Sequence, residues 1–343
     1  MTINKISYFV TGGTDVKKGQ RISSSGWLGL GLKTLTPGEL DDIHGATLKT
    51  LHYSGMKVFS QRALEIFADG GADVDFKNLM VRIPPYMIEE AIDSAPSCII
   101  LAGRDPENDV FVGGKRVHFT TFGAGCRFMD THTGKVAPST KSDIELSALV
   151  CDAMDSVDIF TSPMVATDMP VETAGLHEAE AFLLNTSKHC QHDRLCDGME
   201  ARFFFEMAST IAGGPEKLRE RPIVSTMVCP SSPLQLHKGT AEIIMESADA
   251  GVPVNILSMV MAGATAPVTL AGTLVVHNAE VLGGLALHQL TNRGAPVIYG
   301  SSSTIFDMNC ITAPVGAPEL GMIGAAAAQL ANFYLLPSYV GGT

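Results

Sequence analysis

The 343-residue chain is long enough for one large α/β domain or two ordinary ones, and its 45% hydrophobic and 17% charged residues predict a large interior. A net charge of −12, without any run of Lys or Arg, gives no electrostatic basis for nucleic-acid binding. Seven scattered cysteines without a C-x-x-C pair predict reduced thiols, and residues 1–13 lack the pattern of a signal peptide. We therefore expect a cytoplasmic protein that binds neither nucleic acid nor membrane.

Residues 1–115 have the mixed pattern of an N-terminal α/β module. Thr36, Pro37 and Glu39 have the spacing of a helix start with an N-cap residue, a proline in the first turn and an acid three residues after the cap. A second short helix carries Leu64 and ends at a glycine pair, and a third begins at the proline pair 84–85. Residues 98–101 read as a strand.

From residue 116 onward, short apolar strands alternate with longer helices, so we expect a second unit over residues 116–343. The expected strands are 117–122, 157–162, 189–195, 223–228, 254–259, 297–300 and 336–340. The expected helices are 142–154, 172–187, 200–212, 236–250, 268–292 and 317–334.

One stretch, 252–276, is uncharged for the length of a membrane span. Prolines and glycines interrupt it, at Pro253, Gly263, Pro267 and Gly272. We interpret it as a buried strand, a tight loop and the start of a buried helix.

Alternating strands and helices imply parallel strands, in either a (β/α)8 barrel or a doubly wound sheet. No G-x-G-x-x-G fingerprint follows the first strand, which favours the barrel. Only seven strands are expected, so the barrel would be incomplete, with its last strand and C-terminal part missing. Either the sheet is open or the chain is part of a longer reading frame.

Two C-terminal blocks resemble the trimethylamine:corrinoid methyltransferase family. They are PVIYGSSSTIFDMN at 296–309 with APVGAPE at 313–319, and QLANFYLLPSYVGGT at 329–343. Weaker matches at 114–123 and 152–158 extend the resemblance over nearly the whole chain. The resemblance is to the branch with a catalytic pyrrolysine, encoded by an amber codon after a Tyr-Val-x-Gly-Thr stretch. It implies that pyrrolysine follows Thr343 and that this chain alone is inactive.

The resemblance also implies a reaction and partners. Such an enzyme moves a methyl group from trimethylamine to the Co(I) corrinoid of a cognate partner protein during methylamine-dependent methanogenesis, leaving dimethylamine. No cofactor is bound tightly, because the corrinoid is carried by the partner. We also expect a homo-oligomer, since the chain has little charged surface for its size.

Barrel enzymes place their chemistry at the carboxyl ends of the strands, and this rule selects site candidates. Trimethylammonium has no lone pair, so the site needs a proton acceptor; His192, Asp307 and Glu319 are the candidates. Candidate substrate-binding residues are Phe122, Tyr299, Ser301 and Tyr339. Other polar or soft side chains at expected strand ends are Ser162, Asp193, Cys229 and Met259. The alternatives are that the aromatic residues belong to the core and that Asp307 and Glu319 only cap a loop or helix.

The cluster His189, Cys190, His192 and Cys196 has the residue types of a metal site. On a strand, positions 190 and 192 share one face and 189 and 191 the other, so the ligands do not converge. We therefore expect no metal site.

Two other functions stay open. A relative without pyrrolysine would demethylate a quaternary amine such as glycine betaine, and its gene would encode an ordinary residue after Thr343. Alternatively, the chain is an inactive fragment that serves only in assembly, which exposed barrel edges disfavour.

Overall fold

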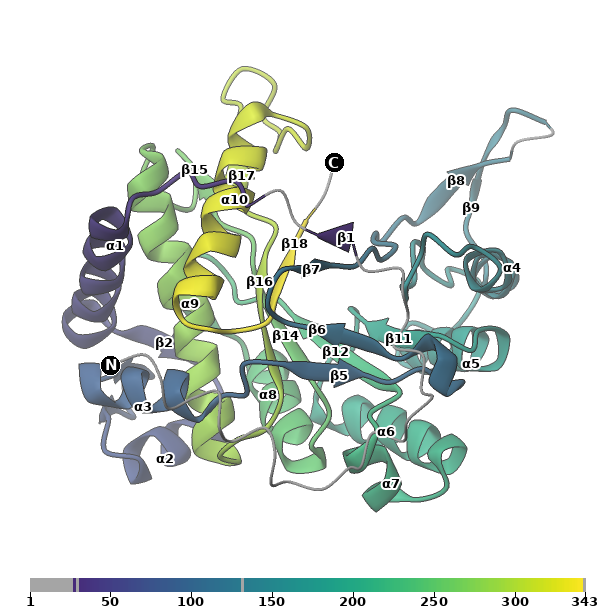
Figure 1. The fold of residues 1–343 in the computed structure, drawn as a ribbon, viewed down its shortest axis with the longest axis horizontal. Helices are drawn as coiled ribbons and strands as arrows, with labels where there is room; N and C mark the ends of the chain where they lie inside the picture. Colours follow the sequence, from purple (N-terminus) through teal and green to yellow (C-terminus); the bar gives the residue numbers. More distant parts are fainter. Residues whose placement is uncertain (1–26, 29–30, 131–132, 342–343) are drawn as a thin grey trace.

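A computed structural model describes residues 27–28, 31–130 and 133–341. The sequence predictions for residues 1–13 and for the residue after Thr343 lie outside this part of the chain. A six-stranded parallel sheet forms the centre (Figure 1), in the order β10-β11-β12-β14-β16-β18. These strands are Ile159–Thr161, His189–His192, Val224–Val228, Val254–Ser258, Val297–Ser301 and Ser338–Val340.

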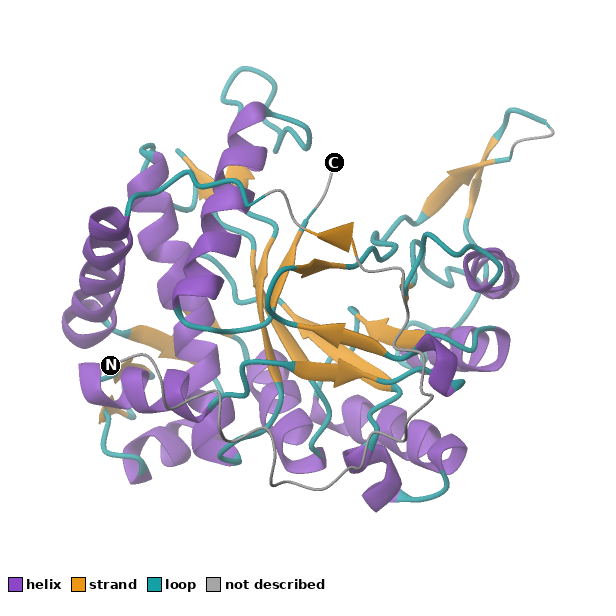
Figure 2. Ribbon diagram, in the orientation of Figure 1, coloured by secondary structure: helices purple, strands orange, loops and turns teal. Residues whose placement is uncertain are grey.

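Strand order decides between the two expected sheet types. Each of the six strands pairs in parallel with the next one along the chain, without the reversal of order that defines a doubly wound sheet. The sheet curls, and helices cover its outer side (Figure 2). The described strands therefore form an open part of a (β/α)8 barrel, as predicted.

Helices follow the strands as expected, with small shifts at their ends. They are α4 (Lys141–Asp152), α5 (Ala174–Asn185), α6 (Gly198–Ala212), α8 (Lys238–Ala250), α9 (Leu270–Thr291) and α10 (Pro318–Phe333). The sequence did not predict α7 (Pro215–Glu220), which is a short helix of six residues after Gly213 and Gly214. Two pairs of short strands lie elsewhere: β15 (Met261–Ala262) with β17 (Thr304–Ile305), and β8 (Arg127–Met129) with β9 (Val136–Pro138), the latter a projecting hairpin (Figure 1).

The expected strand 117–122 is shorter than predicted. Only Arg116–Val117 is strand (β7), and it pairs with β1 (Trp27–Leu28). Further on, Thr120 makes a single parallel bridge to Ile159 of β10. The Thr121 hydroxyl accepts a hydrogen bond from the Thr161 N–H at 3.0 Å and donates one to the Thr161 carbonyl at 2.6 Å. A side chain thus occupies the backbone groups that a regular ladder would use, so the segment lies beside β10 without extending it.

The N-terminal helices pack on the longest helix of the barrel. They are α1 (Pro37–Lys49), followed by a π-helical turn (Thr50–Ser54), α2 (Gln61–Asp69) and α3 (Pro85–Ser94); all three helices contact α9. Thr36 and Glu39 form the predicted capping box, with the Thr36 N–H donating to the Glu39 carboxylate at 2.8 Å. A small sheet accompanies these helices, in the order β13 (Gln235–Leu236), β2 (Met56–Val58), β4 (Met80–Arg82) and β3 (Asp73–Asp75).

The amino end of the barrel is closed by a hairpin. It consists of β5 (Ile99–Leu101), at the predicted strand, and β6 (Val110–Val112). Leu101 and Val110 form a cluster with Ile159 of β10 and Ile298 of β16. Those two residues therefore face the barrel interior, and the opposite, carboxyl end of the sheet is the end available for a site.

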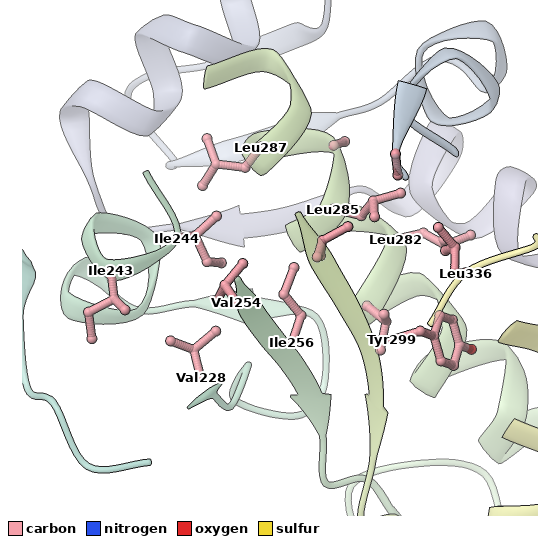
Figure 3. Close-up of a cluster of buried hydrophobic side chains, with 14 of the residues drawn as sticks. Val228, Ile243, Ile244, Val254, Ile256, Leu282, Leu285, Leu287, Tyr299 and Leu336 are labelled. Carbon is pink, nitrogen blue, oxygen red and sulfur yellow. The ribbon is translucent and has the colours of Figure 1, made fainter. Parts of the chain in front are cut away.

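Between the sheet and the helices lies the main core (Figure 3), where Ile256, Leu282 and Leu285 are fully or almost fully buried. The uncharged stretch 252–276 contains β14, β15 and the first turns of α9, as predicted. Among the described residues α9 is the one helix with the length and composition of a membrane span, and its most apolar window is 72% buried inside the protein.

Candidate functional site at the carboxyl ends of the barrel strands

Side-chain alternation on β11 decides which residues reach the barrel interior. The His192 ring packs on Phe182 and Phe204, with centroids 5.5 and 5.2 Å away, on the side of the helices. His189 instead bonds the Ser225 hydroxyl on the neighbouring strand at 2.9 Å. The predicted division of positions 190 and 192 from 189 and 191 is therefore confirmed. Asp193 follows Gln191 by two residues and therefore lies on the same, inward-facing side of the strand.

His192, the first candidate proton acceptor, is placed away from the interior. It is 1% exposed, and its Nε2 lies 2.8 Å from the Gly175 carbonyl of α5. Burial lowers the pKa of His192 to about 4, so the ring is neutral at physiological pH. With one ring nitrogen on a helix carbonyl and two phenylalanine rings around it, His192 helps pack the helices on the sheet.

Tyr299 and Ser301 share the outward face of β16. The Tyr299 hydroxyl donates to Asn278 of α9 at 2.9 Å, and Asn278 donates to the Tyr334 hydroxyl at 2.7 Å. Tyr299 stands among the leucines of the main core (Figure 3) and is 2% exposed. Ser301 is also buried. Neither side chain points into the barrel interior. Tyr299 is therefore a core aromatic residue, which was the alternative prediction from the sequence.

Asp307 and Glu319 lie on the connection between β17 and α10. The Asp307 carboxylate accepts the N–H groups of Asn309 and Cys310 at 2.8 and 3.1 Å, and these bonds lower its pKa. Glu319 is in the first turn of α10. Asp307 thus caps a turn, as the sequence left open, and Glu319 has the position of an acid at a helix N-terminus.

Phe122 and Tyr339 are brought together although 217 positions separate them in the sequence. Their ring centroids are 6.5 Å apart. Tyr339 projects from the inward face of β18 and packs on the apolar cluster at the barrel floor, while Phe122 is 48% exposed. Burial, and to a smaller extent the nearby Asp193 carboxylate, raise the pKa of Tyr339 well above its ordinary value, so its hydroxyl stays protonated.

Asp193 adds a carboxylate to this pair. Its side chain is 7% exposed, and its Oδ1 accepts no hydrogen bond from the described residues; the Nε of Arg194 lies 3.7 Å away. Burial raises the pKa of Asp193 to about 7. Cys229, which follows β12, lies close enough to Asp193 to be affected by its charge. Desolvation of the thiol raises its pKa to about 11, and the Asp193 and Glu280 carboxylates add to the effect. We call Phe122, Asp193, Cys229 and Tyr339 the strand-end site.

The loop that carries Asp193 is fixed by ion pairs and hydrogen bonds. Arg194 pairs with Glu178 of α5, whose side chain is 1% exposed, and Glu178 also accepts the Ala166 N–H at 2.9 Å. Asp197 caps α6 by accepting the Glu200 N–H at 2.9 Å. The position of Asp193 is therefore set by its neighbours in the chain, although its Oδ1 accepts no hydrogen bond from the described residues.

Comparison with known proteins supports the resemblance noted in the sequence. Residues 30–343 match the family described as trimethylamine methyltransferase (MTTB). The chain belongs to that family. A trimethylamine methyltransferase MttB of Desulfitobacterium hafniense is 51% identical over 92% of this chain and 63% of its own length, and that of Methanosarcina barkeri strain Fusaro is 44% identical over 92% and 64%. The chain thus spans just under two thirds of these relatives.

More distant similarities extend beyond trimethylamine methyltransferases. A glycine betaine methyltransferase of Desulfitobacterium hafniense is 34% identical over 90% of this chain and 64% of its own length. A crystal structure of the Methanosarcina barkeri monomethylamine methyltransferase MtmB, 11% identical, covers 90% of this chain and 66% of that one, with a TM-score of 0.49.

For this member of the family, sequence reasoning missed a polar layer beneath Asp193. The amide oxygen of Gln191 and both side-chain polar atoms of Asn255 are buried without a hydrogen-bond partner among the described residues. Gly300 of β16 makes room for the Asn255 amide, because a Cβ at residue 300 would clash with the amide oxygen. The alternation of side chains along β11 could have predicted this layer, since Gln191 lies two residues before Asp193 on the inward face of the strand. Among the described residues, no three potential metal ligands lie together.

Proposed function

We propose that this chain forms most of the barrel of a trimethylamine:corrinoid methyltransferase. The observation that carries the proposal is the strand-end site: two aromatic rings and a buried carboxylate meet at the end of the barrel where such enzymes hold their substrates. Membership of the trimethylamine methyltransferase family supports the same reaction. In this proposal the methyl group passes from trimethylamine to the Co(I) corrinoid of a partner protein, and dimethylamine is released.

The chain's own residues would bind and orient the amine. The faces of Phe122 and Tyr339 attract a methylated ammonium group, because the electron-rich ring faces carry partial negative charge. The barrel floor under Tyr339 is apolar and excludes water from one side of the substrate. Pyrrolysine, which we propose follows Thr343, supplies an electrophilic imine carbon that activates the amine. The chain then contributes position and environment, which in such reactions account for much of the rate.

Glycine betaine is the second candidate substrate, because one relative carries that name. Betaine bears a carboxylate beside its quaternary nitrogen. At the strand-end site that carboxylate would meet the Asp193 carboxylate, while the Arg194 guanidinium already lies between Asp193, 3.7 Å away, and Glu178. Like charges in a partly buried site repel, so the site favours an amine without a carboxylate.

The proposal is tested by methyl transfer in vitro. The full-length protein from its native cells is mixed with its corrinoid partner reduced to Co(I), and trimethylamine or glycine betaine is added. We expect the corrinoid spectrum to change to that of methyl-Co(III), with one dimethylamine formed per methyl group, from trimethylamine and not from betaine. No transfer from trimethylamine would contradict the proposal.

Three further parts of the proposal have their own tests. A peptide that spans Thr343, analysed by mass spectrometry of the native protein, should contain pyrrolysine at the next position; an ordinary residue there would contradict this part. We propose a cytoplasmic location, supported by seven free cysteines, and thiol alkylation in intact cells should label the exposed ones. We also propose a homo-oligomer, and light scattering should give a mass at least twice that of one full-length chain.

A further inference from the structure

Asp193 is the one group of the strand-end site that combines charge, burial and an oxygen that accepts no hydrogen bond from the described residues. It follows β11 on the inward side, its side chain is 7% exposed, and Oδ1 accepts no hydrogen bond from the described residues. A buried carboxylate oxygen without a partner is costly, because water solvates it far better than the protein interior does. Such an atom close to Tyr339 and Cys229 at the carboxyl end of the barrel indicates a ligand that brings a positive charge or a hydrogen-bond donor.

Trimethylammonium brings both. Its single N–H is a donor, its charge is spread over three methyl groups, and at neutral pH the protonated form dominates. We infer that Asp193 binds the protonated amine as its counter-ion and then removes its N–H proton, while Phe122 and Tyr339 contact the methyl groups. This inference rests on the proposed function and names the proton acceptor that function requires.

The proton transfer balances within the site. The N–H bond of trimethylammonium breaks, an O–H bond forms on the Asp193 carboxyl group, and the electron pair stays on nitrogen as the lone pair of the neutral amine. No oxidant or further reactant is needed. The raised pKa of Asp193, about 7, brings the carboxyl closer to the amine in proton affinity, so the transfer is less unfavourable than it would be to an exposed aspartate.

Other titratable groups around the site are poorer proton acceptors. The Tyr339 hydroxyl and the Cys229 thiol both have raised pKa values and are protonated at neutral pH, so neither can accept a proton. Arg194 is a cation and accepts no proton: its Nε lies 3.7 Å from the Asp193 Oδ1, and its terminal nitrogen pairs with Glu178 of α5. Glu280 of α9, which acts electrostatically on Cys229, accepts hydrogen bonds from the Ser258 and Ser232 hydroxyls at 2.6 and 3.0 Å.

The inference is tested on the full-length enzyme with its corrinoid partner. Asp193→Asn keeps the shape but removes the charge and the proton acceptor, and Asp193→Glu restores the carboxylate one methylene further out. Asp197→Asn is the matched control: it removes the same charge four residues away, and asparagine caps a helix as well as aspartate does. For each variant, kcat/KM for trimethylamine is measured against pH, and binding of tetramethylammonium is measured by calorimetry.

We expect kcat/KM of Asp193→Asn to fall by about 100-fold or more, the usual contribution of a general base. In the unsubstituted enzyme kcat/KM should decrease below about pH 7, as Asp193 becomes protonated. This decrease, the acid limb of the pH profile, should be absent from Asp193→Asn. Asp193→Glu should recover part of the activity and should again show the acid limb. Asp197→Asn should have the same pH profile and kcat/KM as the unsubstituted enzyme. Tetramethylammonium carries charge but no proton, and Asp193→Asn should weaken its binding as well.

Two outcomes would overturn the inference. One is an Asp193→Asn enzyme whose acid limb persists and whose kcat/KM is within about threefold of the original, far less than a base contributes. The other is tetramethylammonium binding that is unaffected by Asp193→Asn. Failure of the proposed function is distinguishable, because the unsubstituted enzyme would then transfer no methyl group from trimethylamine at any pH.

Discussion

His192 and Asp193 are adjacent in the chain, yet one packs under the helices and the other lies at the strand-end site. From the sequence one can predict that alternate residues of a strand share a face, and this was correct for positions 189 to 192. Which face points inward depends on the partners of the strand, here Phe182 and Phe204 outside and Ser225 inside. Those contacts are tertiary, so the position of His192 could not be derived from its strand alone.

At the same scale, Arg194 should matter for stability because of its partner. Arg194→Met would leave the Glu178 carboxylate, 1% exposed, without its cation. Loss of one member of a buried pair typically costs about 3–5 kcal/mol, since the remaining charge is not solvated. We expect urea unfolding of Arg194→Met to show a loss of about this size.

A matched control for Arg194 is available on α6. Arg202→Met removes a guanidinium that is 59% exposed and pairs with Glu246 at 2.9 Å. Exposed pairs contribute roughly 0–1 kcal/mol, so this variant should unfold near the unsubstituted protein. Equal losses for the two variants would refute a special role for the buried pair.

Individual elements differ in how far the sequence determines them. The capping box at Thr36 and the helix starts at prolines are local signals, and the helices begin where these residues predict. The prediction of a strand at 117–122 was wrong for most of the segment, because the Thr121 hydroxyl forms hydrogen bonds with the backbone of Thr161. A side chain that replaces a ladder hydrogen bond depends on the neighbouring strand and leaves no signal in its own segment.

Gly300 of β16 gives a prediction at the scale of one strand pair. A Cβ at this position would meet the Asn255 amide oxygen and would lie 2.8 Å from the Cα of Leu257, both on β14. Since that Cα belongs to the paired strand, it cannot move without disturbing the sheet. We expect Gly300→Ala to lower the free energy of unfolding by about 1–3 kcal/mol, the usual cost of overpacking, as measured in urea.

Gly321 in α10 is the matching control. A Cβ there meets no atom within 4 Å. Alanine is a better helix former than glycine by roughly 0.5–1 kcal/mol, so Gly321→Ala should be neutral or stabilising. A Gly300→Ala protein as stable as Gly321→Ala would show that the sheet can accommodate the methyl group.

At the scale of the whole molecule, the order of strands was predictable because parallel strands joined by helices tend to follow the chain. The (β/α)8 architecture and most helix positions follow from that periodicity. The strand-end site was predictable only as a region. The strand-end rule named Phe122, Asp193, Cys229 and Tyr339 among its candidates, but their convergence depends on the curl of the sheet and on the β5–β6 hairpin at its floor.

The distribution of buried histidines predicts how the molecule responds to acid. Burial lowers the pKa of His189 and His192 to about 4, and that of His277 and His288 to about 3. Below about pH 6.5 the unfolded chain protonates these rings and the folded one does not, so each costs up to about 1.4 kcal/mol of stability per pH unit. Asp109, Asp193, Glu200 and Glu280 act in the opposite direction, because burial raises their pKa values on folding.

Of these four carboxyl groups only Asp193 has its pKa raised as far as about 7, so the four buried histidines outweigh them, and we expect the free energy of unfolding to fall between about pH 6.5 and pH 4.5. Urea denaturation at a series of pH values measures this slope. His277→Gln removes one titrating ring and should make the slope shallower over the same range. A stability that is flat or rising toward acid would contradict these histidine pKa values.

The proposed function requires that the methylated amine binds at the strand-end site. The most direct measurement is a crystal structure of the full-length protein with tetramethylammonium, which has methyl groups and charge like those of the proposed substrate but no proton to lose. We predict density for the cation against the rings of Phe122 and Tyr339, next to the Asp193 carboxylate. A cation bound elsewhere, for example beside Asp307 and Glu319 near the start of α10, would contradict the site.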